Sequence, residues 1–311
     1  MKHLNWFTLV VMIFIIHHTT FSQKEKEVKV KTEDGTLYGS LISVAEKNNA
    51  PIVIIIPGSG PTDRNGNSML VQGNSYRFLA EDLAKEGIAS LRYDKLMIGK
   101  SKSDLTEQDL TFEKNVGQVT AWIDYLKKKK YNNIILIGHS EGSLIGMLAA
   151  QQREVSKFIS LSGPGRNIEE VLIQQLSEQA PELIIEIQTI LSVLKQGKMV
   201  DNVSPELSSL FRTSIQPYII SWLKYSPKNE IEKLEIPVLI LHGSTDIQIT
   251  EEDAKLQKEG NPKAKLIIIE EMNHVLKEAS DNKDENMKTY YNPKLPLHKE
   301  LIPVLVEFIN N

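Results

Sequence analysis

The chain has 311 residues, of which 41% are hydrophobic and 24% are charged, and these proportions are typical of a globular protein with a sizeable core. Its formal net charge is −4 at pH 7 and its lysines and arginines are scattered along the chain, so we expect no nucleic-acid partner. The chain contains no cysteine, which excludes disulfide bonds, a cysteine nucleophile and a cysteine-ligated metal site.

The first 22 residues have the pattern of a secretory signal peptide. Lys2 supplies a positive charge, residues 4–16 form an almost continuous apolar run, and Thr20-Phe21-Ser22 provides small residues before a cleavage point. We therefore predict that residues 1–22 are removed and that residues 23–311 form a secreted or periplasmic domain without a stable membrane anchor. The alternative is an uncleaved anchor, but the apolar run is shorter than the roughly 20 residues that a membrane-spanning helix needs.

Two kinds of strand pattern follow along the chain. Alternating apolar residues flank the turn sequence Glu33-Asp34-Gly35 and predict an antiparallel hairpin over residues 28–44. The next apolar runs are short and solid, as in parallel strands that are buried on both faces. They lie at residues 52–56, 88–93, 134–137, 158–161, 238–241 and 266–269. Helical spacing predicts helices at residues 76–86, 112–130, 144–152 and 301–309. This alternation predicts an α/β fold with one mostly parallel sheet and helices on both faces.

The segment between Gly163 and Ile236 contains no convincing strand. Residues 168–194 form a long amphipathic stretch, and three prolines follow it at Pro205, Pro217 and Pro227. Because connections between parallel strands are usually much shorter, we interpret residues 165–230 as a helical insertion and predict that it forms a lid over the site. The alternative is a set of ordinary surface helices with no gating role.

The sequence Gly138-His139-Ser140-Glu141-Gly142 matches the Gly-x-Ser-x-Gly pattern of a nucleophilic serine. A buried strand is predicted directly before it and a helix directly after it. A nucleophile elbow needs this order, because the serine occupies a strained turn and small residues on either side allow the two backbones to pass. We therefore predict that Ser140 is a nucleophile.

A serine nucleophile needs a histidine base that is held by an acid. Three histidines lie in the predicted signal peptide, and His139 is confined beside Ser140. Of the remaining three, His274 follows the last predicted strand, where such a base is expected, whereas we expect His242 to support a neighbouring loop and His298 to be solvated.

The acid should lie between Ser140 and His274 in the chain, on a loop after a strand. Asp246 meets this condition, and the residues between it and His274 leave room for one helix and one strand. Glu270 or Glu271 is the alternative acid, and Asp246 could instead be a helix cap or a turn residue.

The loop after the first parallel strand, Pro57-Gly58-Ser59-Gly60-Pro61, is rich in glycine and is expected to contribute to an oxyanion hole. We predict that the backbone N–H groups of Ser59 and Glu141 are the two donors. Arg64, farther along this loop, could bind a substrate carboxylate, but we favour an internal ion pair.

Together, these motifs resemble those of the esterase and serine-aminopeptidase-like branch of the α/β-hydrolase superfamily. The motifs include the loop of residues 57–65, Arg92-Tyr93-Asp94-Lys95, the Ser140 pentapeptide, the Asp246 loop and Asn273-His274. The resemblance covers residues 28–311 and implies an eight-stranded fold, hydrolysis of carboxylic esters, and neither a metal nor an organic cofactor. One departure is that Leu96-Met97 stands where this branch usually has Arg-Gly.

The expected function is therefore hydrolysis of a small-molecule ester by Ser140, His274 and Asp246 through an acyl-enzyme. One alternative is a peptidase that removes N-terminal residues, with Glu141, Glu169 or Glu170 binding the substrate amino group. Another is a binding protein that retains the fold without the activity.

Overall fold

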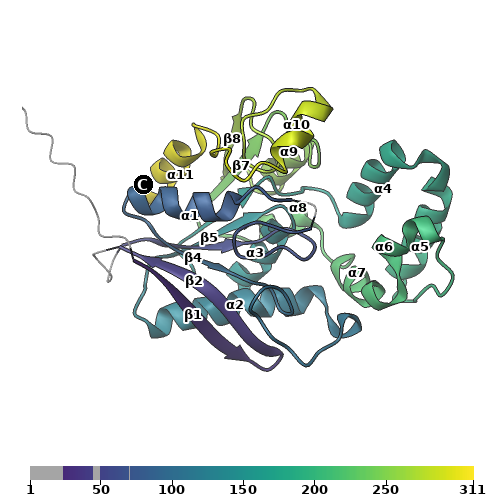
Figure 1. Ribbon diagram of the computed structural model, residues 1–311, viewed down its shortest axis with the longest axis horizontal. Coiled ribbons are helices and arrows are strands. Elements are labelled where there is room, and N and C mark those ends of the chain that lie inside the picture. The colour runs from purple at the N-terminus through teal and green to yellow at the C-terminus, as the bar shows by residue number, and fades with distance from the viewer. Residues whose placement is uncertain (1–23, 45–49, 70) are drawn as a thin grey trace, which may run out of the picture.

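The computed structural model describes residues 24–44, 50–69 and 71–311 (Figure 1). Within them, eight strands form one sheet in the order β1-β2-β4-β3-β5-β6-β7-β8. Strand β2 pairs antiparallel with both β1 and β4, and all other neighbours are parallel. The strands are β1 (Lys24–Thr32), β2 (Gly35–Ser43), β3 (Ile52–Ile56), β4 (Ala89–Tyr93), β5 (Ile134–His139), β6 (Lys157–Leu161), β7 (Val238–Gly243) and β8 (Lys265–Ile269). The predicted α/β fold with a mostly parallel sheet is confirmed.

The α-helices of the described residues fall into two groups. Six belong to the layers around the sheet or to the loops at its edge: α1 (Ser75–Lys85), α2 (Phe112–Lys128), α3 (Glu141–Gln152), α9 (Glu251–Gly260), α10 (Lys283–Thr289) and α11 (Leu301–Asn310). Five lie between β6 and β7: α4 (Ile168–Gln179), α5 (Ile184–Lys195), α6 (Ser208–Phe211), α7 (Gln216–Trp222) and α8 (Pro227–Glu232).

Each face of the sheet is covered by helices, and strand β3 shows why. Ile52, Ile54 and Ile56 pack with α2 and α3, whereas Val53 and Ile55 pack with α1 and α11, because successive side chains of a strand point to opposite faces. All five β3 side chains are buried. A strand buried on both faces has no polar positions, which explains the solid apolar runs in the sequence.

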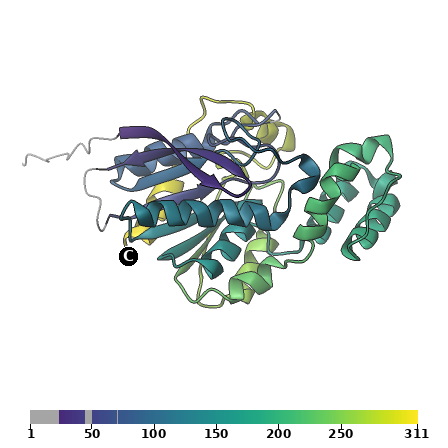
Figure 2. The same cartoon turned by 90° about the horizontal axis from the view of Figure 1, so that it is seen from below.

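Most of the segment between β6 and β7 packs into a second apolar cluster, which Ile249 after β7 also joins. Its core includes Ile187, Leu191 and Phe211, and α4 to α7 project to one side of the sheet (Figures 1 and 2). The long helical stretch predicted over residues 168–194 is interrupted, because α4 ends at Gln179 and a 3-10 turn begins at Pro181. Proline lacks an N–H group and disfavours helical geometry in the residue before it, here Ala180.

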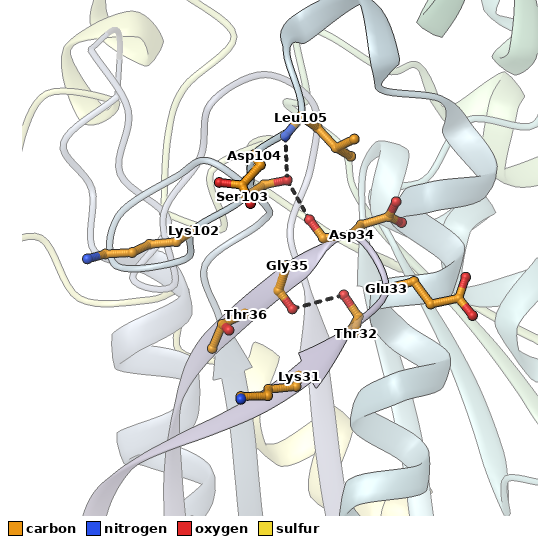
Figure 3. A pocket seen from close by; sticks show the side chains of 10 residues that line it. All are labelled: Lys31, Thr32, Glu33, Asp34, Gly35, Thr36, Lys102, Ser103, Asp104 and Leu105. Atoms are coloured by element: carbon orange, nitrogen blue, oxygen red, sulfur yellow. Dashed lines mark hydrogen bonds between the residues drawn. The ribbon is translucent and has the colours of Figure 1, made fainter.

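The hairpin of β1 and β2 packs its turn against the loop that follows β4. A side chain at Gly35 would collide with the carbonyl oxygen of Lys102, so this turn requires glycine. A hollow of about 370 Å³ lies between the turn and the loop, and its lining consists of residues 31–36 and 102–105 (Figure 3). None of the residues predicted to act in catalysis borders this hollow.

The predicted signal peptide, residues 1–22, lies outside the described residues. Within the part of the chain that is described, no helix is both long enough and apolar enough to cross a membrane.

Candidate active site

Ser140 lies at the sharp turn between β5 and α3. Its backbone has φ 54° and ψ −125°, a strained conformation for a residue with a side chain. A side chain at Gly138 would collide with the carbonyl of Gly142, and one at Gly142 would collide with the carbonyl of Ile56. The glycines of the pentapeptide therefore allow β5, α3 and the end of β3 to meet. The Ser140 side chain is partly exposed and its hydroxyl donates no hydrogen bond to any other described residue.

His274 and Asp246 are in direct contact. The Nδ1 atom of His274 lies 2.8 Å from Oδ2 of Asp246, and their side chains are 5% and 0% exposed. With the carboxylate as acceptor, Nδ1 carries the hydrogen and Nε2 of the neutral ring is free to accept a proton. Burial opposes the charge of Asp246, but His274 and the backbone N–H of Ile249 outweigh burial and hold the Asp246 pKa below its ordinary value.

Two buried asparagines join the loops that carry Asp246 and His274. The Asn273 side chain donates to Oδ1 of Asn286 at 2.9 Å, and Asn286 donates to the carbonyl of Thr245 at 2.8 Å. Asn286 belongs to α10, a helix that was not predicted. These bonds fix the residues next to the acid and the base, and no local pattern in the sequence indicates them.

His139 connects the nucleophile turn to the base and to the glycine-rich loop. One ring nitrogen, Nε2, lies 2.7 Å from the carbonyl oxygen of His274 and must donate to it. Burial lowers the pKa of His139 to about 3, so the ring is neutral and its Nδ1 accepts from the Tyr76 hydroxyl at 2.8 Å. That hydroxyl in turn accepts from the N–H of Gly58 at 3.0 Å. In each of these three hydrogen bonds, the donor and the acceptor are thus determined.

The glycine-rich loop after β3 runs beside the serine. A Cβ atom at Gly58 would lie 3.2 Å from Cβ of Ser140, so the next residue, Ser59, is close to the nucleophile. No described residue accepts from the Ser59 N–H. Glu141 is the first residue of α3, where an N–H has no acceptor within the helix. Both predicted donors are therefore available to a ligand.

Similarity to known proteins agrees with this architecture. A family model described as serine aminopeptidase, S33, matches residues 70–218. Esterase EstD of Thermotoga maritima is 25% identical over 232 residues, which are 73% of this chain and 54% of EstD. The chain thus spans about half the length of this curated relative.

Solved esterase structures share the fold over nearly the whole chain. The esterase Pf2001 of Pyrococcus furiosus has a TM-score of 0.59 at 18% identity and is matched over 99% of this chain and 98% of its own. Est1E from Butyrivibrio proteoclasticus has a TM-score of 0.58 at 20% identity, with 92% and 99% covered. The chain has the fold of the α/β-hydrolase superfamily. The predicted resemblance to its esterase and serine-aminopeptidase-like branch is confirmed by the family model and the curated relative.

The other ionisable residues considered for this site have different positions. His242 is buried and its Nε2 lies 3.0 Å from the carbonyl oxygen of Ile249, so it supports the acid loop as expected. The expectation for His298 is wrong, because His298 is only 3% exposed and its N–H donates to the carbonyl of Leu276 at 2.9 Å. The chain before α11 is bonded to the base loop a second time, where Nζ of Lys277 donates to the carbonyl of Leu295 at 2.6 Å. Glu270 and Glu271 are both exposed, and Asp246 holds His274 instead.

Arg64 forms the internal ion pair that we favoured. Its Nη2 lies 2.6 Å from Oδ2 of Asp94, and both side chains are buried. Asp94 belongs to the Arg-Tyr-Asp-Lys motif of residues 92–95, where β4 ends. The pair therefore ties the glycine-rich loop to the end of β4. Within the described residues, no group of three or more histidine, aspartate or glutamate side chains could hold a metal ion.

Proposed function

We propose that this protein is a serine hydrolase that cleaves carboxylic esters of small molecules, with Ser140 as nucleophile, His274 as base and Asp246 as the orienting acid. The observation that carries the proposal is the 2.8 Å bond between His274 and Asp246. The backbone carbonyl of the same His274 accepts a hydrogen bond from His139, the residue before Ser140. The esterase names of the similar proteins support the same reaction.

The proposed reaction has two steps, acylation of Ser140 and hydrolysis of the acyl-enzyme. The Ser140 oxygen attacks the ester carbonyl carbon while His274 takes the hydroxyl proton, and the N–H groups of Ser59 and Glu141 bind the resulting oxyanion. The tetrahedral intermediate collapses, the C–O bond to the alcohol breaks, and His274 protonates the departing alkoxide. Water then attacks the acyl-enzyme with His274 as base, which releases the carboxylic acid and restores Ser140.

The acids considered for a peptidase are engaged elsewhere. Glu141 is buried and accepts a hydrogen bond from Tyr218, Glu169 pairs with Lys195, and Glu170 caps the start of α4 through the Asn167 N–H. Each of the three therefore has a partner within the protein, and an amino group of a substrate would have to compete with it. This favours ester hydrolysis, although the description of the matching family model keeps serine aminopeptidase as the second candidate.

Kinetics on two substrate classes test the proposal. The wild-type protein should hydrolyse p-nitrophenyl butyrate and leave aminoacyl-p-nitroanilides almost intact. Ser140→Ala should lower kcat by about 10⁶-fold, and Asp246→Asn by about 10⁴-fold because it disturbs the histidine tautomer. Full ester turnover by Ser140→Ala would refute Ser140 as nucleophile. Efficient anilide cleavage with negligible ester turnover would instead select the peptidase, and absence of fluorophosphonate labelling at Ser140 would select a binding protein.

We also propose that residues 1–22 direct secretion and that the helices between β6 and β7 act as a lid. The support for secretion is the N-terminal sequence pattern. Support for a lid is the apolar cluster that α4 to α7 form with Ile249 and the bond from Tyr218 of α7 to Glu141 beside Ser140. Mass spectrometry of the protein exported from its native host would locate the N-terminus. A signal peptide predicts that the exported chain begins at residue 23, and an intact Met1 would refute cleavage.

A further inference from the structure

A buried lysine contacts the loop that carries one of the two proposed oxyanion donors. Lys95 follows β4 and its side chain is 9% exposed. Its Nζ donates to the carbonyl oxygen of Gly58 at 2.7 Å. The mechanism proposed above assigns Lys95 no role, and a buried ammonium group costs free energy that an apolar side chain would not.

Because the peptide group is planar, the bond from Lys95 to the Gly58 carbonyl also fixes the direction of the Ser59 N–H. The carbonyl of Gly58 and the N–H of Ser59 belong to the same planar peptide unit, and in a trans peptide they point in opposite directions. Holding the Gly58 oxygen toward Lys95 therefore directs the Ser59 N–H away from Lys95. Gly58 is also held by its own N–H, which donates to Tyr76. With both of its polar groups bonded, Gly58 cannot rotate its peptide groups freely, despite lacking a side chain.

The same lysine lies near the residue that supplies the second donor. Its Nζ is 3.9 Å from Oε2 of Glu141, whose side chain is 2% exposed. The other carboxylate oxygen accepts from the Tyr218 hydroxyl, which in turn accepts from Asn115 at 2.8 Å. Burial lowers the pKa of Lys95, with Glu141 opposing it, and burial raises the pKa of Glu141 against Lys95 and Tyr218. One buried cluster thus touches both segments of the proposed oxyanion hole.

We propose that Lys95 is a positioning residue for catalysis, which holds the Gly58–Ser59 peptide so that the Ser59 N–H faces the developing oxyanion. The inference rests on the proposed ester hydrolysis. A donor fixed before the reaction needs no reorganisation in the transition state, so its loss should affect the chemical step more than substrate binding.

Lys95→Met removes the hydrogen bond and retains a long, unbranched side chain. With p-nitrophenyl butyrate we expect kcat to fall about 10- to 100-fold, since loss of a whole oxyanion donor costs about 10²- to 10³-fold, while KM stays within about threefold. Affinity for a short-chain trifluoromethyl ketone, whose adduct with serine carries an oxyanion, should fall in parallel with kcat/KM. A merely structural role would not produce this parallel loss.

The double variant Lys95→Met/Glu141→Gln separates positioning from charge balance. It removes the unpaired carboxylate that Lys95→Met leaves buried, so it should recover thermal stability but not kcat. Recovery of kcat in the double variant would overturn the inference, as would a folded Lys95→Met protein with unchanged kcat. Failure of the proposed ester hydrolysis would give a different result, because the wild-type protein itself would then show no Ser140-dependent ester turnover. In that case the proposed role of Lys95 would also be refuted.

Discussion

Met97 occupies a backbone conformation that disfavours any residue with a side chain. Its φ is 66°, it is 42% exposed, and the Ile98 N–H closes the turn by donating to the Lys95 carbonyl. Glycine is usual at such a position in a turn, and the resembled branch usually has glycine where this chain has Met97. We expect Met97→Gly to raise the free energy of unfolding by about 0.5 to 1 kcal/mol, because relief of the left-handed strain exceeds the extra entropy of the unfolded glycine.

Met97→Ala is the matched control for this prediction. Alanine also removes the long side chain but keeps Cβ, so it retains the unfavourable backbone conformation. Urea unfolding of the three proteins measures the difference. Equal stability of the glycine and alanine variants would show that the conformation of Met97 is not strained.

Helix α9 is joined to the start of the helical segment through one carboxylate. The side chain of Asp253 is 0% exposed and pairs with Arg166 at 2.6 Å, and its Oδ1 also accepts from the N–H of Gly165 at 3.0 Å. Asp253 caps its own helix as well, by accepting from Thr250. We expect Asp253→Asn to lower the free energy of unfolding by about 2 to 3 kcal/mol, because it leaves Arg166 without its charged partner.

An exposed ion pair between helices α4 and α5 provides the comparison. Glu169 and Lys195 are 22% and 59% exposed, and pairs of this kind contribute about 0 to 1 kcal/mol. Glu169→Gln should therefore change the unfolding free energy by less than about 0.5 kcal/mol in the same denaturant series. Similar losses in both variants would contradict the special role of Asp253.

The stability of the whole molecule should depend on pH through His139. Its pKa is about 3 in the folded protein and about 6.5 in an unfolded chain. Since the folded value is the lower one, the unfolded chain binds more protons between these values, and stability that is complete above about pH 6.5 is lost as the pH falls toward 3. From pH 7.5 to 5 this single group should cost about 2 kcal/mol.

His139→Gln isolates this contribution, because glutamine retains an amide donor but does not titrate. Unfolding free energies of both proteins at pH 7.5 and pH 5 are to be compared. The pH-dependent loss should be about 2 kcal/mol smaller in the variant, even if the variant is less stable at both pH values. Parallel curves would mean that His139 is not held neutral by burial.

Local patterns in the sequence determined the fold class of this protein. Buried parallel strands such as β3 have apolar residues at every position, and the Gly-x-Ser-x-Gly turn requires glycine where three backbones meet. The buried strands and the turn can each be recognised from a few consecutive residues. The mostly parallel sheet and the position of Ser140 between a strand and a helix were therefore predictable. The chain order of Ser140, Asp246 and His274 also indicated the candidate site, whose catalytic role stays a prediction.

Only the tertiary structure decided which polar groups hold that site. Tyr76 meets His139 across 63 residues of chain, Lys95 meets Gly58 across 37, and Tyr218 meets Glu141 across 77. Such contacts have no periodicity and no fixed spacing, because each depends on where two separate elements pack. The burial of His298 was missed for the same reason. The turn that carries Ser140 can be found from local pattern, whereas the bonds that orient the residues around it arise from packing between distant segments.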